Sequence, residues 1–156
     1  MNQKMEHTAG LHYTAIDLLR MKGPVLEELF RNSGVDSIPG GRGRGTVLVA
    51  PGTFIAGLLA KLLYAIAWRG KVVDRGSGTL LNIVSPIGVK AIKARVYKDS
   101  SWVDGSECIV LDYSKTSLVA RWIRDEIREV APGVWLGIVF WSRRKVAKFV
   151  LVFPHS

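Results

Sequence analysis

Residues 131–153 read APGVWLGIVFWSRRKVAKFVLVF, and this stretch decides the fold class. Pro132-Gly133 predicts a tight turn, because proline fixes one backbone angle and glycine tolerates the conformations that turns require. The apolar run 134–141 follows the turn directly. The next run, 145–153, places an apolar residue at every second position from Ala147 on, as a half-buried strand does. The stretch therefore predicts neighbouring antiparallel strands.

The same pattern extends back to Gly70, with short segments separated by turn signals at the spacing of all-β proteins, about eight to twelve residues. Residues 118–130 fit a helical period as well as strand alternation, and the short turn at Pro132 favours a strand. Six or so antiparallel strands would leave two open edges, which closure into a barrel removes. The other expected strands are 71–75, 79–84, 89–98 and 107–114.

The first half of the chain predicts helices. Within 11–32 the apolar residues recur every three or four positions, and Gly23-Pro24 divides this segment into two short helices. A further helix is expected at 54–68, where it could plug or cover the barrel mouth. This helix would measure about 21 Å, too short to cross the hydrocarbon layer of a membrane.

The segment 39–45 contains four glycines and is interpreted as a flexible connector. Arg42 and Arg44 are candidate anion contacts within it, and a short strand is expected at 46–50. The predicted fold class is α+β, with N-terminal helices packed on an antiparallel, closed, lipocalin-like β-barrel. The chain is expected to form a single domain over 1–156, comprising a flexible tail at 1–10, a mainly helical part at 11–68 and strands at 70–153.

Charge and rare residues narrow the function classes. The net charge is +9, but the 22 Lys and Arg residues are scattered, which favours solubility and generic attraction to anions over specific nucleic-acid binding. Cys108 is the single cysteine, and its apolar neighbours predict a buried, inert thiol in a reducing compartment such as the cytoplasm. All three histidines lie in terminal segments, so we expect no haem, metal, other cofactor or histidine triad.

Several short pieces carry a resemblance to a known group of proteins. In order, they are 68–71 (WRGK), 94–97 (ARVY), 112–113 (DY), 124–128 (RDEIR) and 132–137 (PGVWLG). They resemble small uncharacterised bacterial proteins of lipocalin-like, calycin-type β-barrel character, and are loosely similar to proteins with a Gly-x-Trp-x-Gly motif. Here residues 43–46 (GRGT) stand where that motif is expected, without its tryptophan. The resemblance implies a barrel that holds a small apolar molecule, favours a strand at 124–130, and implies no reaction.

Asp112 is the polar residue that we expect to be most informative. It shares a strand face with Cys108 and Val110, and a buried carboxylate needs a cation, which Arg95 or Arg124 could supply. An ion pair that only fixes strand register remains an alternative. The candidate ligand-binding residues are Arg95, Tyr97, Asp112, Tyr113, Arg124, Asp125 and Trp135.

The sequence favours a binding protein over an enzyme. The expected ligand is a hydrophobic or amphipathic molecule in the barrel, and the positive charge allows an anion. One alternative is a cofactor-independent cyclase or isomerase in which Asp112 or Asp125 acts with a tyrosine. Asp125 and its neighbour Glu126 cannot face one cavity together, because adjacent strand residues point to opposite faces. A second alternative is a peripheral membrane protein that attaches through helix 54–68.

Overall fold

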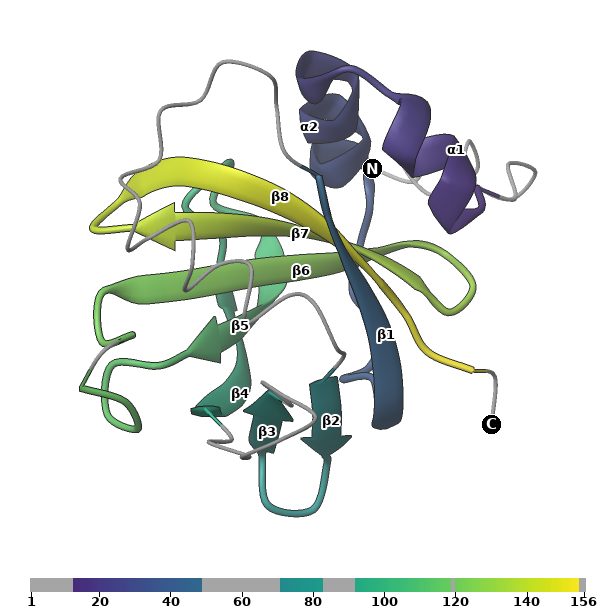
Figure 1. Ribbon diagram of the computed structural model, residues 1–156. Helices are drawn as coiled ribbons and strands as arrows, with labels where there is room; N and C mark the ends of the chain where they lie inside the picture. The colour runs from purple at the N-terminus through teal and green to yellow at the C-terminus, as the bar shows by residue number, and fades with distance from the viewer. Residues whose placement is uncertain (1–12, 49–70, 83–91, 119, 155–156) are drawn as a thin grey trace.

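The computed structural model describes residues 13–48, 71–82, 92–118 and 120–154, and these form two short helices and eight strands (Figure 1). Each strand pairs antiparallel with the next along the chain, and β8 pairs with β1 to close the barrel. The predicted fold class, helices beside a closed antiparallel barrel, is therefore confirmed. The strands are β1 (Gly41–Leu48), β2 (Lys71–Asp74), β3 (Thr79–Asn82), β4 (Ile92–Ser100), β5 (Glu107–Asp112), β6 (Ile123–Ala131), β7 (Val134–Trp141) and β8 (Arg144–Val152).

β6 settles the ambiguous segment 118–130 in favour of a strand. β7 has the predicted bounds, and β8 matches its predicted range to within one residue at each end. The expected helix 54–68 lies outside the described residues.

The glycine-rich segment was interpreted wrongly as a connector, because residues 41–45 belong to β1. Gly43 explains why the strand needs glycine: a Cβ atom at this position would lie 2.6 Å from Cζ of the Phe153 ring. Glycine inside a strand commonly marks such a close approach. The missing side chain lets the aromatic ring lie against the β1 backbone.

Two helices pack on the outside of the barrel, α1 (Ala15–Arg20) against β8 and α2 (Gly23–Asn32) against β6 and β7. Thr14 and Asp17 form a capping box at the start of α1, which satisfies backbone donors that the first turn leaves free. Pro24 stands in the first turn of α2, where its missing N–H costs little. The predicted division at Gly23-Pro24 is thus confirmed.

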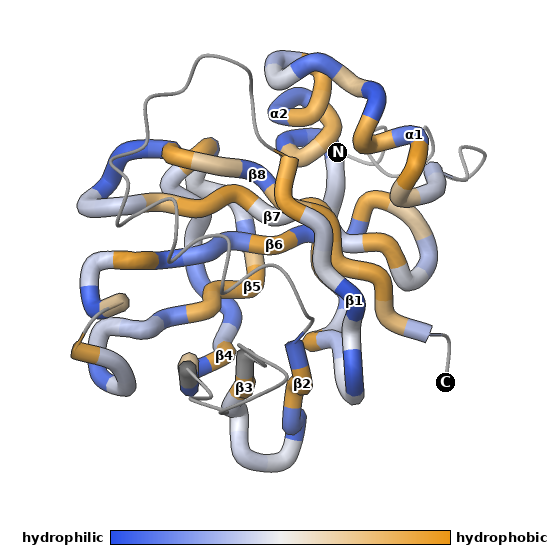
Figure 2. Tube along the Cα trace, in the orientation of Figure 1, coloured by the Kyte–Doolittle hydropathy of each residue, from blue (hydrophilic) through white to orange (hydrophobic). Residues whose placement is uncertain are grey.

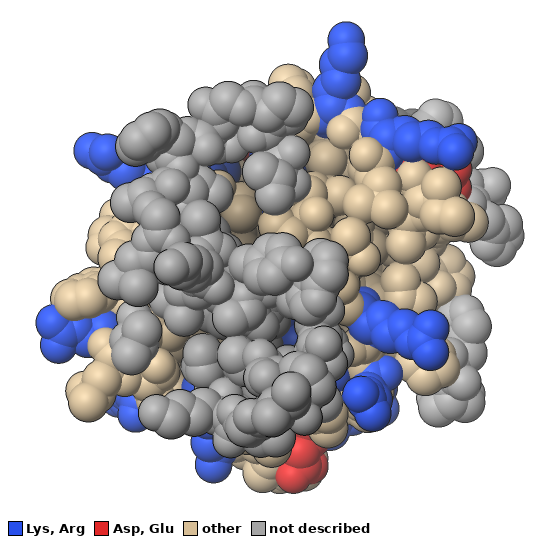
Figure 3. Space-filling view, in the orientation of Figure 1, with Lys and Arg blue, Asp and Glu red and all other residues tan. Residues whose placement is uncertain are grey.

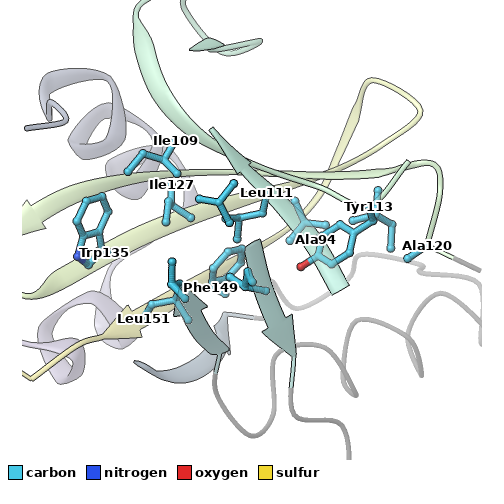
Figure 4. Close-up of a cluster of buried hydrophobic side chains, with 14 of the residues drawn as sticks. Ala94, Ile109, Leu111, Tyr113, Ala120, Ile127, Trp135, Phe149 and Leu151 are labelled. Carbon is cyan, nitrogen blue, oxygen red and sulfur yellow. The ribbon is translucent and has the colours of Figure 1, made fainter. Parts of the chain in front are cut away.

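The sheet separates two apolar clusters. The outer cluster joins Leu18, Leu26 and Phe30 of the helices to strand residues such as Val110 and Leu136. Because the helices cover this face, β7 is buried on both sides over most of its length. Figure 2 shows apolar residues along the strands beneath α1 and α2. The interior cluster, part of which Figure 4 shows, contains Val73, Leu80, Ala94, Val96, Ile109, Leu111, Tyr113, Ala120, Ile123, Ile127, Trp135, Val139, Phe149, Leu151 and Phe153.

Buried charges also stabilise the outer layer. Arg128 donates two hydrogen bonds of 2.8 Å to the Asp104 carboxylate and one of 2.9 Å to the Phe30 carbonyl at the end of α2. Glu126 accepts hydrogen bonds from the Ser101 hydroxyl and the Trp102 N–H. These bonds fix the β4–β5 turn and the end of α2 on the barrel wall.

Gly137→Ala should destabilise the protein. A Cβ atom at Gly137 would lie 2.2 Å from Cζ of Phe149, which is its direct partner across β7 and β8. Because the ring fills the barrel interior, we expect a loss of about 1–3 kcal/mol in the free energy of unfolding, measured by denaturant titration. Gly34→Ala is the control, since its Cβ would meet no atom within 4 Å. Equal stability losses in the two variants would contradict the packing argument.

Candidate functional site

An ion pair crosses the barrel interior between Lys71 and Asp125. The Lys71 Nζ lies 3.0 Å from the Asp125 Oδ2, and the two side chains are 1% and 2% exposed. Lys71 opens β2 and Asp125 lies near the start of β6, four strands away in a ring of eight. The two residues therefore stand on opposite walls, and the long lysine stem spans the space between them.

Tyr113 completes a buried polar cluster with this pair. Its hydroxyl lies 3.2 Å from Asp125 Oδ2 and 3.3 Å from Lys71 Nζ. The ammonium group also lies 4.5 Å from the centre of the Phe149 ring, a cation–π distance. Figure 4 shows the Tyr113 hydroxyl directed into the apolar interior. We call Lys71, Tyr113 and Asp125 the polar cluster.

The other carboxylate oxygen of Asp125 accepts no hydrogen bond from any residue that the structure describes. This oxygen, Oδ1, is buried. A buried carboxylate oxygen without a donor costs free energy, so such groups are rare and often mark functional sites. Within the part of the chain that the structure describes, Asp125 Oδ1 is therefore the acceptor of the polar cluster that lacks a donor.

Of the seven candidate residues, the structure brings Tyr113, Asp125 and Trp135 into the interior. The other four lie on the outer face: Arg95, Asp112 and Arg124 are cross-strand partners there, and Tyr97 pairs with Val110 of the outer cluster. Of the two positions that the sequence leaves open for Asp112, inside the barrel or on its outer face, the structure shows the outer one, and a role in ligand binding stays a prediction.

The contacts of Asp112 explain its outer position. Its carboxylate accepts hydrogen bonds from the Tyr97 hydroxyl at 3.1 Å and the Ser114 N–H at 2.8 Å. Partial burial opposes ionisation, but the bonds from Ser114 and Tyr97 outweigh it and lower the pKa of Asp112. The bond from Tyr97 joins β4 to the end of β5. The expected ion pair of Asp112 with Arg95 or Arg124 is not among the salt bridges of the described residues, where Arg124 pairs with Asp99 and Glu126.

Sequence reasoning missed Lys71, because a lysine at the start of a short strand is usually solvated. One signal could have found it: Lys71 stands two residues before Val73, so both side chains share a strand face. Val73 faces the interior, and Lys71 follows it there.

Cys108 belongs to the outer cluster, where it is fully buried. Burial, assisted by the negative charge of Glu126, raises the pKa of the thiol to about 12. A thiol so rarely ionised is a poor nucleophile, which agrees with the predicted inert cysteine. Within the described ranges, no group of three or more His, Cys, Asp or Glu residues could hold a metal ion, and no helix is long and apolar enough to cross a membrane.

Comparisons with known proteins give information about the fold alone. No known protein family matches the sequence, and no curated protein matches it. The barrel is similar to the crystal structure of a protein from Thermomonospora curvata, with a TM-score of 0.56 and 21% sequence identity. The match covers 86% of this chain and 89% of that chain. At this identity the similarity shows a shared fold and assigns no ligand or reaction.

Removing one member of the Lys71–Asp125 ion pair should lower the free energy of unfolding much more than removing both members. Lys71→Met leaves the Asp125 carboxylate buried without its cation, so we expect a loss of about 3–5 kcal/mol in unfolding free energy. The double variant Lys71→Met/Asp125→Leu replaces both charges with apolar groups and should be near neutral or more stable. Denaturant titration of the three proteins measures both changes. A double variant less stable than Lys71→Met would contradict this account of the pair.

Proposed function

We propose that the protein binds a small, mostly apolar molecule inside the barrel through a hydrogen bond to Asp125 Oδ1. The observation that carries this proposal is the buried Asp125 Oδ1, which has no hydrogen-bond partner among the described residues and lies beside the interior apolar cluster. Binding sites for small molecules combine apolar walls with a few polar groups that fix orientation. The polar cluster supplies such a group, and Trp135 belongs to the wall.

Charge balance indicates the kind of ligand. Lys71 and Asp125 neutralise each other at 3.0 Å, so the interior needs no added charge. An anion would lose its hydration and would also be repelled by Asp125, because charges interact strongly where water is excluded. The best complement is a neutral molecule with one hydroxyl or N–H donor, rather than the anionic ligand that the net charge of the chain allows.

A second candidate function is catalysis of a proton shift in the bound molecule. The Tyr113 hydroxyl lies 3.2 Å from the Asp125 carboxylate and 3.3 Å from the Lys71 ammonium group. Asp125 could accept a proton from carbon beside a ligand carbonyl, while the Tyr113 hydroxyl turns its one proton from Asp125 Oδ2 to the carbonyl oxygen. This is the isomerase alternative, with its acid and base assigned to Asp125 and Tyr113.

The binding proposal predicts a preference for hydrogen-bond donors. Decanol, dodecanol and cyclohexylethanol should each bind more tightly than the corresponding methyl ether, which lacks the donor. A hydrogen bond to a buried charged group is worth about 1.5–3 kcal/mol, so the preference should be roughly 10- to 150-fold for the alcohol that fits best. Titration calorimetry measures these dissociation constants, and native mass spectrometry of the purified protein shows any ligand already bound.

Matched variants test whether the preference for an alcohol over its ether depends on Asp125. In Lys71→Met/Asp125→Leu the alcohol and its ether should bind equally, since the acceptor is gone. The control Lys98→Met/Glu107→Gln removes an ion pair of 3.2 Å that is exposed to solvent, and should keep the preference. If no alcohol binds the wild-type protein better than its ether, and no small molecule co-purifies, the proposal is wrong.

The catalytic candidate has a separate test. A long-chain methyl ketone in deuterium oxide should exchange the hydrogens beside its carbonyl faster with the wild-type protein than with Asp125→Asn or Tyr113→Phe. Proton NMR measures the exchange rate. Equal rates in all three proteins would exclude this proton shift and leave the binding proposal untouched.

A further inference from the structure

A second surface of the barrel carries exposed apolar and basic side chains. Leu118 and Trp122 of the β5–β6 loop are 87% and 48% exposed. Trp122 contacts Trp141 with a ring separation of 5.9 Å, and its carbonyl accepts a hydrogen bond from Ser142 N–H at the β7–β8 turn. We call the β5–β6 loop and the β7–β8 turn, which these Trp122 contacts join, the tip. Its exposed or half-buried apolar and basic residues include Leu118, Arg121, Trp122, Trp141, Arg143 and Arg144.

The tip has a strongly positive charge. The sequence segments 113–122 and 141–148 contain two and four Lys or Arg residues respectively, and no Asp or Glu. Lys145 is already paired with Glu27 at 2.7 Å, whereas Arg121, Arg143 and Arg144 are exposed. Figure 3 shows basic and no acidic side chains along the left edge of the view, where Figure 1 places the β5–β6 loop and the β7–β8 turn.

We propose that the tip docks on the surface of an anionic lipid bilayer. An exposed leucine and tryptophan can enter the interfacial region of a bilayer, and nearby arginines are attracted to anionic headgroups. Exposed apolar groups rimmed by polar residues are a common mark of surfaces that contact a partner or a membrane. This inference rests on the tip alone, so it stands or falls independently of the interior ligand.

The ring contacts favour lipid over single-stranded nucleic acid. Nucleic-acid surfaces use free aromatic faces for base stacking. In the tip, the Arg121 guanidinium lies 3.9 Å from the centre of the Trp122 ring. Trp102 adjoins the tip, and the guanidinium groups of Arg124 and Arg143 each lie 4.4 Å from the centre of its ring. These rings already stack on cations, whereas Leu118, the most exposed apolar side chain of the tip, offers nothing to a base.

The tip lies close to the polar cluster of the barrel interior. The β5–β6 loop joins the end of β5 to the start of β6, and Tyr113 and Asp125 lie at those two strand ends. Trp141 of the tip packs against the interior apolar cluster. A bilayer in contact with the tip would therefore lie next to the rim of the barrel that holds the polar cluster, and an apolar ligand could exchange there with little exposure to water.

Vesicle binding tests the proposal. The full-length protein should sediment with vesicles of equal parts phosphatidylcholine and phosphatidylglycerol, and more weakly with pure phosphatidylcholine. Leu118→Ser/Trp122→Ser should weaken binding at least about tenfold, because it removes the apolar groups that enter the interface. Arg121→Gln/Arg144→Gln should weaken it by roughly 30-fold, as expected for two basic residues near an anionic surface.

Controls separate docking from generic attraction. Ile16→Ser/Val25→Ser removes two apolar side chains of the helices that are 59% and 52% exposed, and should bind as the wild-type protein does. Arg20→Gln/Arg42→Gln removes two exposed charges outside the tip. It should weaken vesicle binding much less than Arg121→Gln/Arg144→Gln does. Circular dichroism should show that every variant is folded.

Wild-type protein provides a readout that needs no variant. Brominated lipid in the anionic vesicles should quench part of its tryptophan fluorescence, because Trp122 enters the interface. Absence of quenching, or unchanged sedimentation of Leu118→Ser/Trp122→Ser, would overturn the proposal and leave charge attraction alone. Tip-dependent binding to a single-stranded oligonucleotide without vesicle binding would overturn it in favour of a nucleic-acid surface.

Discussion

The ion pair between Lys71 and Asp125 is the constraint on which the barrel interior depends. Two charges removed from water are costly, and the attraction between them recovers that cost only with close contact and further hydrogen bonds. The 3.0 Å separation and the Tyr113 hydroxyl provide such contacts. Phe149 lies below the ammonium group, and Gly137 leaves room for that ring. Residues from five strands or strand ends therefore meet at one cross-barrel interaction.

Strand alternation gives three consecutive charges different roles. Arg124 and Glu126 point outward and hold the β4–β5 turn through hydrogen bonds to Ser100 and Trp102. Asp125 points inward and keeps one oxygen free of partners among the described residues. The outer charges are saturated with contacts, as structural charges must be when buried. The contrast makes Asp125 the residue whose environment is least explained by stability alone.

The sequence predicted the fold more completely than the site. Turn signals and alternation located the strands, and the short connection at Pro132 correctly favoured β6 over a helix. β1 was missed in part because glycines hide alternation, and only the Phe153 ring shows why they are needed.

The site depends on which face of each strand turns inward, and periodicity alone does not determine this. β5 is apolar on both faces, so Asp112 and its neighbours could be assigned to either side. The register places Asp112 opposite the outward Arg95, and places Leu111 opposite Asp125 in the interior. Lys71 comes close to Asp125 only after the barrel closes, since the two residues are 54 positions apart in the chain. Such a contact is invisible to local sequence patterns.

The carboxylate NMR signals of Asp125 and Glu126 test the central claim most directly. The signals are assigned through Asp125→Asn and Glu126→Gln, and followed while the alcohol that binds best is added. The account predicts a saturable shift of the Asp125 signal and a stationary Glu126 signal, because the two neighbours face opposite sides of the wall. Saturable binding that leaves the Asp125 signal unmoved would contradict it.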